Sequence, residues 1–566
     1  MAVKTLCQFR FVLRVRDVRC DLWRSKMRRC PKCKRVFDEN SLKFCRADGA
    51  LLAGDSLNED ATIFFPSGAV SPVSPKTLPE ATSSVAVVPF ANLTPDPANE
   101  YLCVGLAEEL VQALSRIENL RVAAPTSAFS FKGKSADVRD IGRTLNVQVV
   151  LEGSIRRSKN KIRITVQLVN AKNGYQLWSE RYDRQMSESS DVKGEIALAV
   201  VKALEVTLGG PEQSAVAKQH TENSSAHQLY LRGRFHANRF TAEGFRTAVE
   251  YLHKAIAEDP KYALAYAGLA DAYYHVPNVH LTPSESLMQV KAAAEKALDL
   301  DENLVEAHTL LAVVAANYDR TPDEAEKRFK RALELAPNNH LAHQWYGCYL
   351  MSQGRLAAAI GEFCRARELD PLSPMISVLI SFTYFFARQP HKALRHARKA
   401  LARDENFWLG YWGAALAHEQ AGQLIEALGQ LEKATDRDSS PWITALRARV
   451  YAKLGRREIA EAILAEINKN AGTQWVAPYL VATVYLALDQ VDRGFEWLQR
   501  AFDEYDENLN YMAVDPVLDA FRGDPRFIEL LRRAGLNQSN ARTHFVVPVF
   551  AESLSSGHLI SGPLFS

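Results

Sequence analysis

The chain has 566 residues, too many for one hydrophobic core, so three or four folded units are expected. It is 47% hydrophobic and 24% charged, with only 28 Gly and 24 Pro, which argues against a fibrous or wholly disordered chain. Sixty-nine basic residues nearly balance 66 acidic ones, giving a formal charge of +3, which argues against a protein that coats a polyanion along its whole length.

The chain begins with a basic leader, residues 1–29, that we expect to be disordered. Residues 1–35 hold twelve Lys or Arg against Asp17 and Asp21, and such an arm can bind nucleic acid or an anionic membrane. The other interpretation is that translation starts at Met27 and that residues 1–26 are an unfolded upstream extension. No run reaches 18 uninterrupted apolar residues and the leader has no signal-peptide core, so we expect a cytoplasmic protein.

A small zinc-binding module is predicted next, over residues 30–52. Cys30 and Cys33 have two residues between them, and Cys45 and Asp48 repeat that spacing. Two tight knuckles joined by a short hairpin can bring four ligands onto a tetrahedral ion. A unit this small needs the metal for much of its folding free energy.

The pattern resembles the short zinc ribbons that begin many bacterial multidomain proteins. It departs from them at Lys34, where a Gly usually follows the first knuckle. Asp48 is a harder donor than a thiolate, and the alternative is three reduced cysteines without a metal. With all four positions filled by protein, a bound zinc would be structural rather than catalytic.

An α/β domain is expected over residues 84–208, after a Pro-, Ser- and Thr-rich linker at 53–83. Its apolar runs and periods predict both strands and helices. The expected strands are 85–90, 120–124, 147–156, 162–169 and 175–178. The expected helices lie within 99–117, 138–145 and 196–204.

Five motifs in this region resemble the TolB amino-terminal-like domain, which is related to the flagellar FlgO domain. They occupy residues 84–93, 105–110, 126–133, 150–156 and 177–183. The resemblance implies an α/β domain that in bacteria commonly precedes tetratricopeptide repeats, and it implies little about chemistry.

Four carboxylates of this domain, Glu108, Glu109, Glu152 and Glu180, could be read as catalytic groups. The sequence supplies no partner His, no glycine-rich phosphate loop and no paired metal-binding aspartates. We therefore expect these residues to cap helices or form surface ion pairs. We expect no enzymatic activity and no small-molecule substrate.

A helical repeat array is predicted over residues 226–536, after a second linker at 209–225. Six alanines recur along it, and after a longer first interval their spacing settles to about 34 residues, which is the tetratricopeptide period. They are Ala255, Ala297, Ala332, Ala366, Ala400 and Ala434. About eight helix pairs fit the array, and residues 537–566 have no period and are predicted to be a disordered tail.

The first helix of each pair is expected to line the concave side of this array. Aligning the repeats on the recurrent alanine directs a soft apolar stripe toward that side, where it would bind a helix or extended peptide of a partner. The stripe consists of Gln344, Met351, Met375, Val378, Phe382, Phe385, Trp412 and Leu416. The alternative is that these side chains pack between helices.

The sequence thus predicts a multidomain chain, α/β plus all-α, with a zinc ribbon, a TolB-like domain and a tetratricopeptide α-solenoid. The predicted function is a non-catalytic protein-protein interaction scaffold or signalling adaptor. The alternative is a transcriptional or signalling regulator that contacts nucleic acid through the basic end of the zinc ribbon. That ribbon lacks interleaved aromatic residues and a recognition helix.

Overall fold

The computed structural model describes residues 28–29, 36–37 and 83–536, apart from 95, 97–98, 135, 186–191, 207, 240, 276–281, 439 and 471–475. The chain forms two compact units, residues 1–77 and 78–566. In the first unit, β1 (Arg28–Arg29) pairs antiparallel with β2 (Val36–Phe37). The predicted zinc ligands, the leader before residue 28, the linker up to residue 82 and the tail from residue 537 lie outside the described residues.

The second unit begins with a mixed sheet whose strands run in the order β5-β3-β6-β7-β8, with β4 also pairing with β6. β3 is parallel to β5 and β6, while β6, β7 and β8 are antiparallel neighbours. The strands are β3 (Ser83–Val87), β4 (Ala91–Asn92), β5 (Leu120–Val122), β6 (Val149–Ser158), β7 (Lys161–Asn170) and β8 (Gln176–Gln185).

Helices cover both faces of the central strands, which is why residues 85–88, at the end of β3 and just after it, form an uninterrupted apolar run. Val85 and Val87 pack with α1 (Glu100–Leu114) and α4 (Val192–Ala203) in one core cluster. Ala86, between them, faces the opposite side and packs with α2 (Pro125–Phe129) and α3 (Val138–Leu145).

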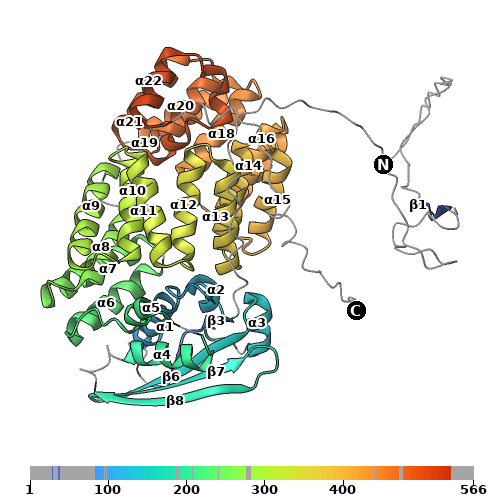
Figure 1. The fold of residues 1–566 in the computed structure, drawn as a ribbon. Coiled ribbons are helices and arrows are strands. Elements are labelled where there is room, and N and C mark those ends of the chain that lie inside the picture. Colours follow the sequence, from blue (N-terminus) through green and yellow to red (C-terminus); the bar gives the residue numbers. More distant parts are fainter. Residues whose placement is uncertain are drawn as a thin grey trace, which may run out of the picture. The chain divides into compact units, whose positions relative to one another are not determined.

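Eight helix pairs follow in the described part of the chain (Figure 1). They are α6 (Ser224–Ala237) with α7 (Ala242–Glu258), α8 (Ala263–His275) with α9 (Pro283–Leu300), α10 (Val305–Asn317) with α11 (Pro322–Leu335), α12 (His340–Ser352) with α13 (Leu356–Leu369), α14 (Pro374–Phe386) with α15 (Pro390–Leu401), α16 (Trp408–Gln420) with α17 (Leu424–Thr435), α18 (Pro441–Lys453) with α19 (Arg457–Asn470), and α20 (Pro478–Ala487) with α21 (Val491–Asp503).

Small residues allow the two helices of a pair to cross closely. All six recurrent alanines are 0% exposed. A Cβ added to Gly347 would lie 2.6 Å from the ring of Phe363, so only glycine fits at that crossing. The period of the repeats therefore reflects a recurring contact between the second helix and its neighbours.

The chain ends its described part in three short helices that follow α21. They are η3 (Glu507–Tyr511), η4 (Pro516–Phe521) and α22 (Pro525–Arg533), of which η3 and η4 are 3₁₀-helices. Leu518 and Phe527 are 0% exposed, so this region is part of the core rather than a loose extension.

Candidate functional site

The predicted binding stripe lies mostly inside the protein. Five of its members are at most 8% exposed: Met351, Val378, Phe385, Trp412 and Leu416. The other three, Gln344, Met375 and Phe382, are half-buried. The prediction that the five buried residues are open to a partner is wrong, because they pack between helices. A binding role for the three half-buried residues stays a prediction.

The C-terminal segment, residues 502–536, packs against earlier repeats of the array. Tyr505 stacks on Tyr318, next to the third pair, with ring centroids 4.8 Å apart. Tyr511 stacks on Phe386 of the fifth pair at 5.3 Å. The C-terminal segment therefore contacts repeats that precede it by more than one hundred residues.

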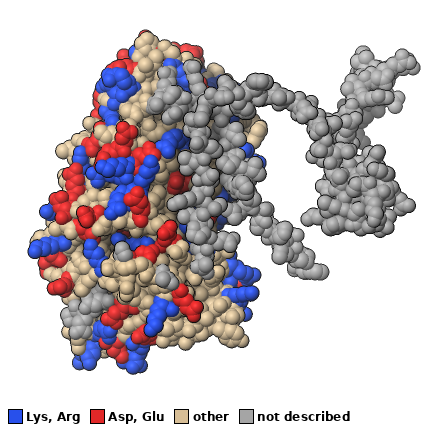
Figure 2. Space-filling model, viewed as in Figure 1, with Lys and Arg blue, Asp and Glu red and all other residues tan. Residues whose placement is uncertain are grey.

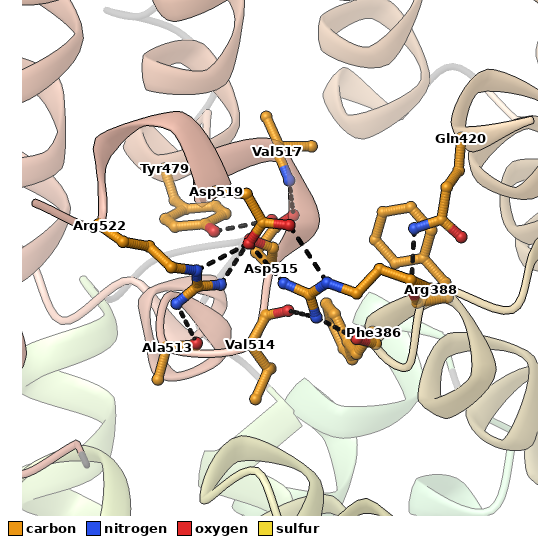
Figure 3. A network of polar contacts seen from close by, with 11 residues as sticks. Phe386, Arg388, Gln420, Tyr479, Ala513, Val514, Asp515, Val517, Asp519 and Arg522 are labelled. Carbon is orange, nitrogen blue, oxygen red and sulfur yellow. Dashed lines mark hydrogen bonds and ion pairs between the residues drawn. The ribbon is translucent and has the colours of Figure 1, made fainter. Parts of the chain in front are cut away.

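Arg388 is the centre of the polar network that holds this segment (Figure 3). Its guanidinium donates to the carbonyl oxygen of Val514 at 2.8 Å and pairs with the carboxylate of Asp519, 3.2 Å from Nε to Oδ2. Arg522 donates to the same carboxylate at 2.7 Å and to the carbonyl of Ala513 at 2.6 Å. Asp519 thus joins the fifth pair to the C-terminal segment.

Arg388 has a positive φ, and so does a second arginine, Arg320. The turn between the helices of the fourth pair uses Gly354, with a φ of 72°. Arg320 and Arg388 occupy the equivalent turns one repeat before and one repeat after it, with φ values of 55° and 56°. A non-glycine residue in this left-handed region costs roughly 1–2 kcal/mol.

Arg320 also contacts the C-terminal segment. It donates to the carbonyl of Phe502 at 2.6 Å, and its guanidinium lies 3.4 Å from the centre of that ring, a cation–π contact. The two strained turns are therefore sites where arginine replaces glycine and binds the C-terminal segment.

A buried ion pair crosses the first helices of the last three pairs. Glu419 accepts two hydrogen bonds from Arg449, at 2.9 and 2.6 Å, and lies 3.0 Å from Nζ of Lys453. Arg449 also donates to the hydroxyl of Thr483 at 3.2 Å. Burial alone would raise the pKa of Glu419, but the two cations outweigh it, so the pKa is lowered and the carboxylate stays ionised. This network is structural and joins α16, α18 and α20.

An aromatic ladder of four side chains, Phe382, Trp408, Trp412 and Trp442, extends over the fifth to seventh pairs. Phe382 meets Trp412 edge to face at 5.3 Å, Trp412 lies 5.6 Å from Trp442, and Trp442 lies 6.5 Å from Trp408. Trp412 is buried and its indole donates to the carbonyl of Trp442 at 3.3 Å. The other three are half-buried, so the ladder keeps aromatic surface in contact with solvent.

The repeat pattern predicted Phe382 and Trp412 as binding residues, but Trp408 and Trp442 were not predicted. Both missed residues lie at or near the start of a first helix, and they are separated by one full repeat period. A tryptophan at the same position in consecutive repeats was therefore a usable signal.

The four carboxylates that could have been catalytic all make contacts within the sheet domain or with the first repeat. Glu108 pairs with Arg234 of α6, with 2.5 Å between Nη2 and Oε1, and Glu109 lies 2.9 Å from Nε2 of His227. The expectation of surface ion pairs is wrong for these two, which are each 6% exposed, because α1 packs against α6. Burial raises the pKa of Glu109, but His227 and Lys193 outweigh it and the pKa is lowered. The other two carboxylates accept hydrogen bonds inside the sheet: Glu152 from Gln167 at 2.5 Å and Glu180 from Tyr182 at 3.1 Å.

The sheet domain binds the loops that follow successive second helices of the array. The amide of Asn338 donates to the carbonyl of Ile117 at 2.8 Å, and the hydroxyl of Thr126 donates to Asp370 at 2.7 Å. Earlier in the array, Lys218 of the connection at 209–225 pairs with Asp301, which follows α9, at 2.8 Å. The sheet domain and the repeats belong to the same compact unit.

The predicted linker at 209–225 takes part in this junction. It contains α5 (Gly210–Ala217), and the hydroxyl of Thr221 donates to Asp259 at 2.5 Å. Residues 209–225 are therefore a packed connection and not a free tether, because their polar side chains pair with the repeats.

A cleft of about 560 Å³ lies between α11, α12 and α22. It is lined by Pro322, Asp323, Glu326, Tyr349, Gln353, Arg355, Ile528, Leu531, Arg532, Gly535 and Leu536. Partial burial raises the pKa of Glu326, but hydrogen bonds from Arg355 and Lys330 outweigh it and bring the pKa to about 2. That carboxylate is engaged by two cations and is not poised as an acid or base at neutral pH.

Family models match two parts of the chain. Residues 81–198 match the second domain of HilA/YgeH-like transcriptional regulators. Residues 310–374 match a tetratricopeptide repeat model, which confirms the repeats predicted from the sequence. The sheet domain thus matches a model other than the TolB-like family, and the TolB-like resemblance stays a prediction.

Relatives of known name cover the chain only in part. A Rhizobium meliloti (strain 1021) protein named "Putative adenylate cyclase 3" is 35% identical over 254 residues, which is 44% of this chain and 43% of that protein. "Transcriptional regulator HilA" of Salmonella typhimurium is 21% identical over 73% of this chain and 68% of its own length. A solved tetratricopeptide repeat protein from Parabacteroides merdae is 14% identical, covers 48% of this chain and 99% of its own, and has a TM-score of 0.36.

Two properties of the described residues bear on the remaining predictions. None of the helices there combines the length and apolar character needed to cross a membrane. Nor do three or more His, Cys, Asp or Glu side chains come together there as a metal site. The predicted zinc ligands are outside that part of the chain, so the zinc prediction is not tested by this result.

Together the fold and these matches give a mostly helical tetratricopeptide-like solenoid with a small sheet domain.

Proposed function

We propose that this chain is a non-catalytic scaffold or signalling adaptor that binds a partner protein through its repeat array. The observation that carries the proposal is the aromatic ladder. Partly exposed Trp and Phe side chains backed by a packed core are the residues that contribute most binding energy at protein interfaces. Solenoid repeats present such surfaces on several consecutive units, so one partner segment can contact all of them.

The partner expected for this surface is an apolar or amphipathic segment of another protein. Three half-buried aromatic rings offer flat apolar area, and Met375, on the same helix as Phe382, adds a flexible apolar side chain. Figure 2 shows basic and acidic side chains interspersed over the viewed face of the array, which suits a protein partner better than a polyanion.

A comparative pull-down from the native host tests this proposal. Trp442→Ala and Trp408→Ala are expected to lose bound proteins that the wild-type chain retains. The matched control is Trp497→Ala on α21, a half-buried tryptophan outside the ladder. Identical sets of bound proteins from the wild type and both ladder variants would refute a binding role for the ladder.

A second candidate is a transcriptional or signalling regulator. It is supported by the name of the family model on residues 81–198 and by the name of the HilA relative. In this version the basic end of the predicted zinc ribbon contacts nucleic acid. A gel shift at several salt concentrations compares the full chain with a chain that lacks residues 1–53. If the chain is a regulator, the deletion abolishes a salt-dependent shift of the nucleic acid. If it is a scaffold, the deletion does not change the gel shift.

The predicted zinc remains part of the proposal. Three thiolates, Cys30, Cys33 and Cys45, with the carboxylate of Asp48 form a donor set that suits a structural tetrahedral zinc site. We also propose that the chain does not turn over ATP, although one relative carries the name of a cyclase. An ATP-turnover assay of the full chain checks this, and turnover abolished by a point change in residues 84–208 would refute it.

A further inference from the structure

The outer edge of β8 offers a place where a second chain can add to the sheet. β8 is the last strand of the sheet among the described strands, and it is ten residues long (Figure 1). Its residues are mostly exposed, and it contains no proline. A long edge strand has a row of backbone N–H and C=O groups free to pair with another strand. The opposite edge strand, β5, is only three residues long.

The charges of β8 are arranged antisymmetrically about Tyr182. The residue on one side, Arg181, is basic, and its counterpart Asp183 on the other side is acidic. One position further out the signs are reversed, with Glu180 before the tyrosine and Arg184 after it. A strand with this pattern is complementary to an antiparallel copy of itself.

We propose that two copies of this chain pair through their β8 strands, antiparallel and about a two-fold axis at Tyr182, to form one continuous sheet. In this register Arg181 faces Asp183 of the second copy, and Glu180 faces Arg184 of the second copy. The symmetry forms each of these pairs twice. Opposite charges directly across two antiparallel strands are stabilising, whereas like charges there are destabilising.

The charges also select this register over its neighbours. In an antiparallel pair, the side chains of two directly opposite residues lie on the same face of the sheet. The two-fold axis must therefore pass through a residue of β8 and not between two residues. An axis at Arg181 places two arginines opposite each other, and an axis at Glu180 or Asp183 places two carboxylates opposite each other. Among these positions, only Tyr182 brings no charge against its own copy.

The charged side chains of β8 make contacts within the chain, and these contacts do not prevent a second strand from pairing with its outer edge. Asp183 accepts from Arg163 at 2.6 Å and lies 3.2 Å from Nε of Arg181, while Arg184 pairs with Glu195 at 2.7 Å. The side chains of Arg181 and Asp183 are 63% and 48% exposed, so they can bind a second charge without being uncovered first. Their partners inside the chain hold them in place for it.

Sedimentation velocity of the full chain over a range of concentrations tests the proposal, with charge variants that address the register. The wild type is expected to form a dimer whose population rises with concentration. Arg181→Asp and Asp183→Arg each place like charges opposite one another at two symmetric positions, so each is expected to weaken dimerisation at least tenfold. An equimolar mixture of the two variants restores both pairs, and it is expected to form a heterodimer.

Two further variants keep the test independent of folding. Arg156→Asp alters an exposed arginine on β6, two strands from the edge, and is expected to dimerise like the wild type. Glu180→Arg repeats the test on the other face if Asp183→Arg does not fold. A wild type that stays monomeric at all concentrations overturns the proposal, as does dimerisation of Arg181→Asp equal to that of the wild type. A mixture with no more dimer than its parent variants overturns it too.

Discussion

Replacing Trp412 with alanine is expected to destabilise the array, whereas the same change at Trp442 is expected to affect mainly the surface. Trp412 is 8% exposed, contacts the rings of Phe382 and Trp442, and donates a hydrogen bond to the carbonyl of Trp442. Truncation of a buried tryptophan to alanine costs about 3–5 kcal/mol of unfolding free energy. The lost hydrogen bond accounts for about 1 kcal/mol of that cost. For the half-buried Trp442 we expect about 1–2 kcal/mol, because part of its ring is already in water.

Hydrogen exchange measured by mass spectrometry reads these costs repeat by repeat. A loss of about 4 kcal/mol in the opening free energy of α14 to α18 corresponds to exchange about a thousandfold faster in those helices. Trp442→Ala should accelerate the same amides by about tenfold or slightly more. Trp497→Ala in α21 is the control and should leave them unchanged. Equal exchange in the Trp412 and Trp442 variants would show that the inner member of the ladder is not buried, which would refute the reasoning.

Three further outcomes follow from the contacts and from the predicted metal site. Arg388→Ala removes the bonds to Val514 and Asp519, so amides of residues 506–536 should exchange about ten- to a hundredfold faster, since hydrogen bonds to charged groups contribute about 1.5–3 kcal/mol. Arg532→Ala, which breaks only an exposed ion pair, should change exchange by less than about fivefold. Burial raises the pKa of Asp506 from its ordinary 3.8 to about 6, so the native state keeps a proton that the unfolded chain loses between those values. The stabilising contribution of the protonated Asp506 is complete below about pH 4 and is lost as pH rises through 6. Asp506→Asn should therefore gain up to about 3 kcal/mol of unfolding free energy relative to wild type between pH 4 and 7. A difference between the two proteins that does not change with pH in denaturant melts would contradict this. Metal analysis of reduced protein should return about one zinc per chain, and Cys33→Ser should lose it; a value near zero in the wild type would refute the site.

The repeat array was predictable because its period reflects local contacts. Each recurrent alanine lies where the second helix of a pair packs closely on neighbouring helices, and the same requirement returns once in every repeat. The β6–β7 hairpin was predictable for a similar reason, since its paired strands are adjacent in the sequence. Hydrophobic period and turn residues report contacts of this range well.

The binding stripe was predicted less well because its environment depends on distant residues. The period identified Val378, Phe385 and Trp412 as apolar positions of first helices, and this is what they are. Phe385 and Trp412 lie in a core cluster built from several repeats, and the ring of Trp412 contacts Phe382 and Trp442 of the pairs on either side. The period of a single repeat does not report this packing between repeats. The pairing of Glu108 with Arg234 was not predicted for the same reason, since the two residues are 126 positions apart in the sequence.

The sequence by itself determined which face of each helix is apolar and how many helix pairs form. Only the tertiary structure decided which apolar faces remain open. That outcome depends on the path of the superhelix, which accumulates small rotations over eight pairs and brings the C-terminal segment back onto the third and fifth pairs. No single repeat encodes that path, so the buried and exposed members of the aromatic ladder could be separated only after the whole array was folded.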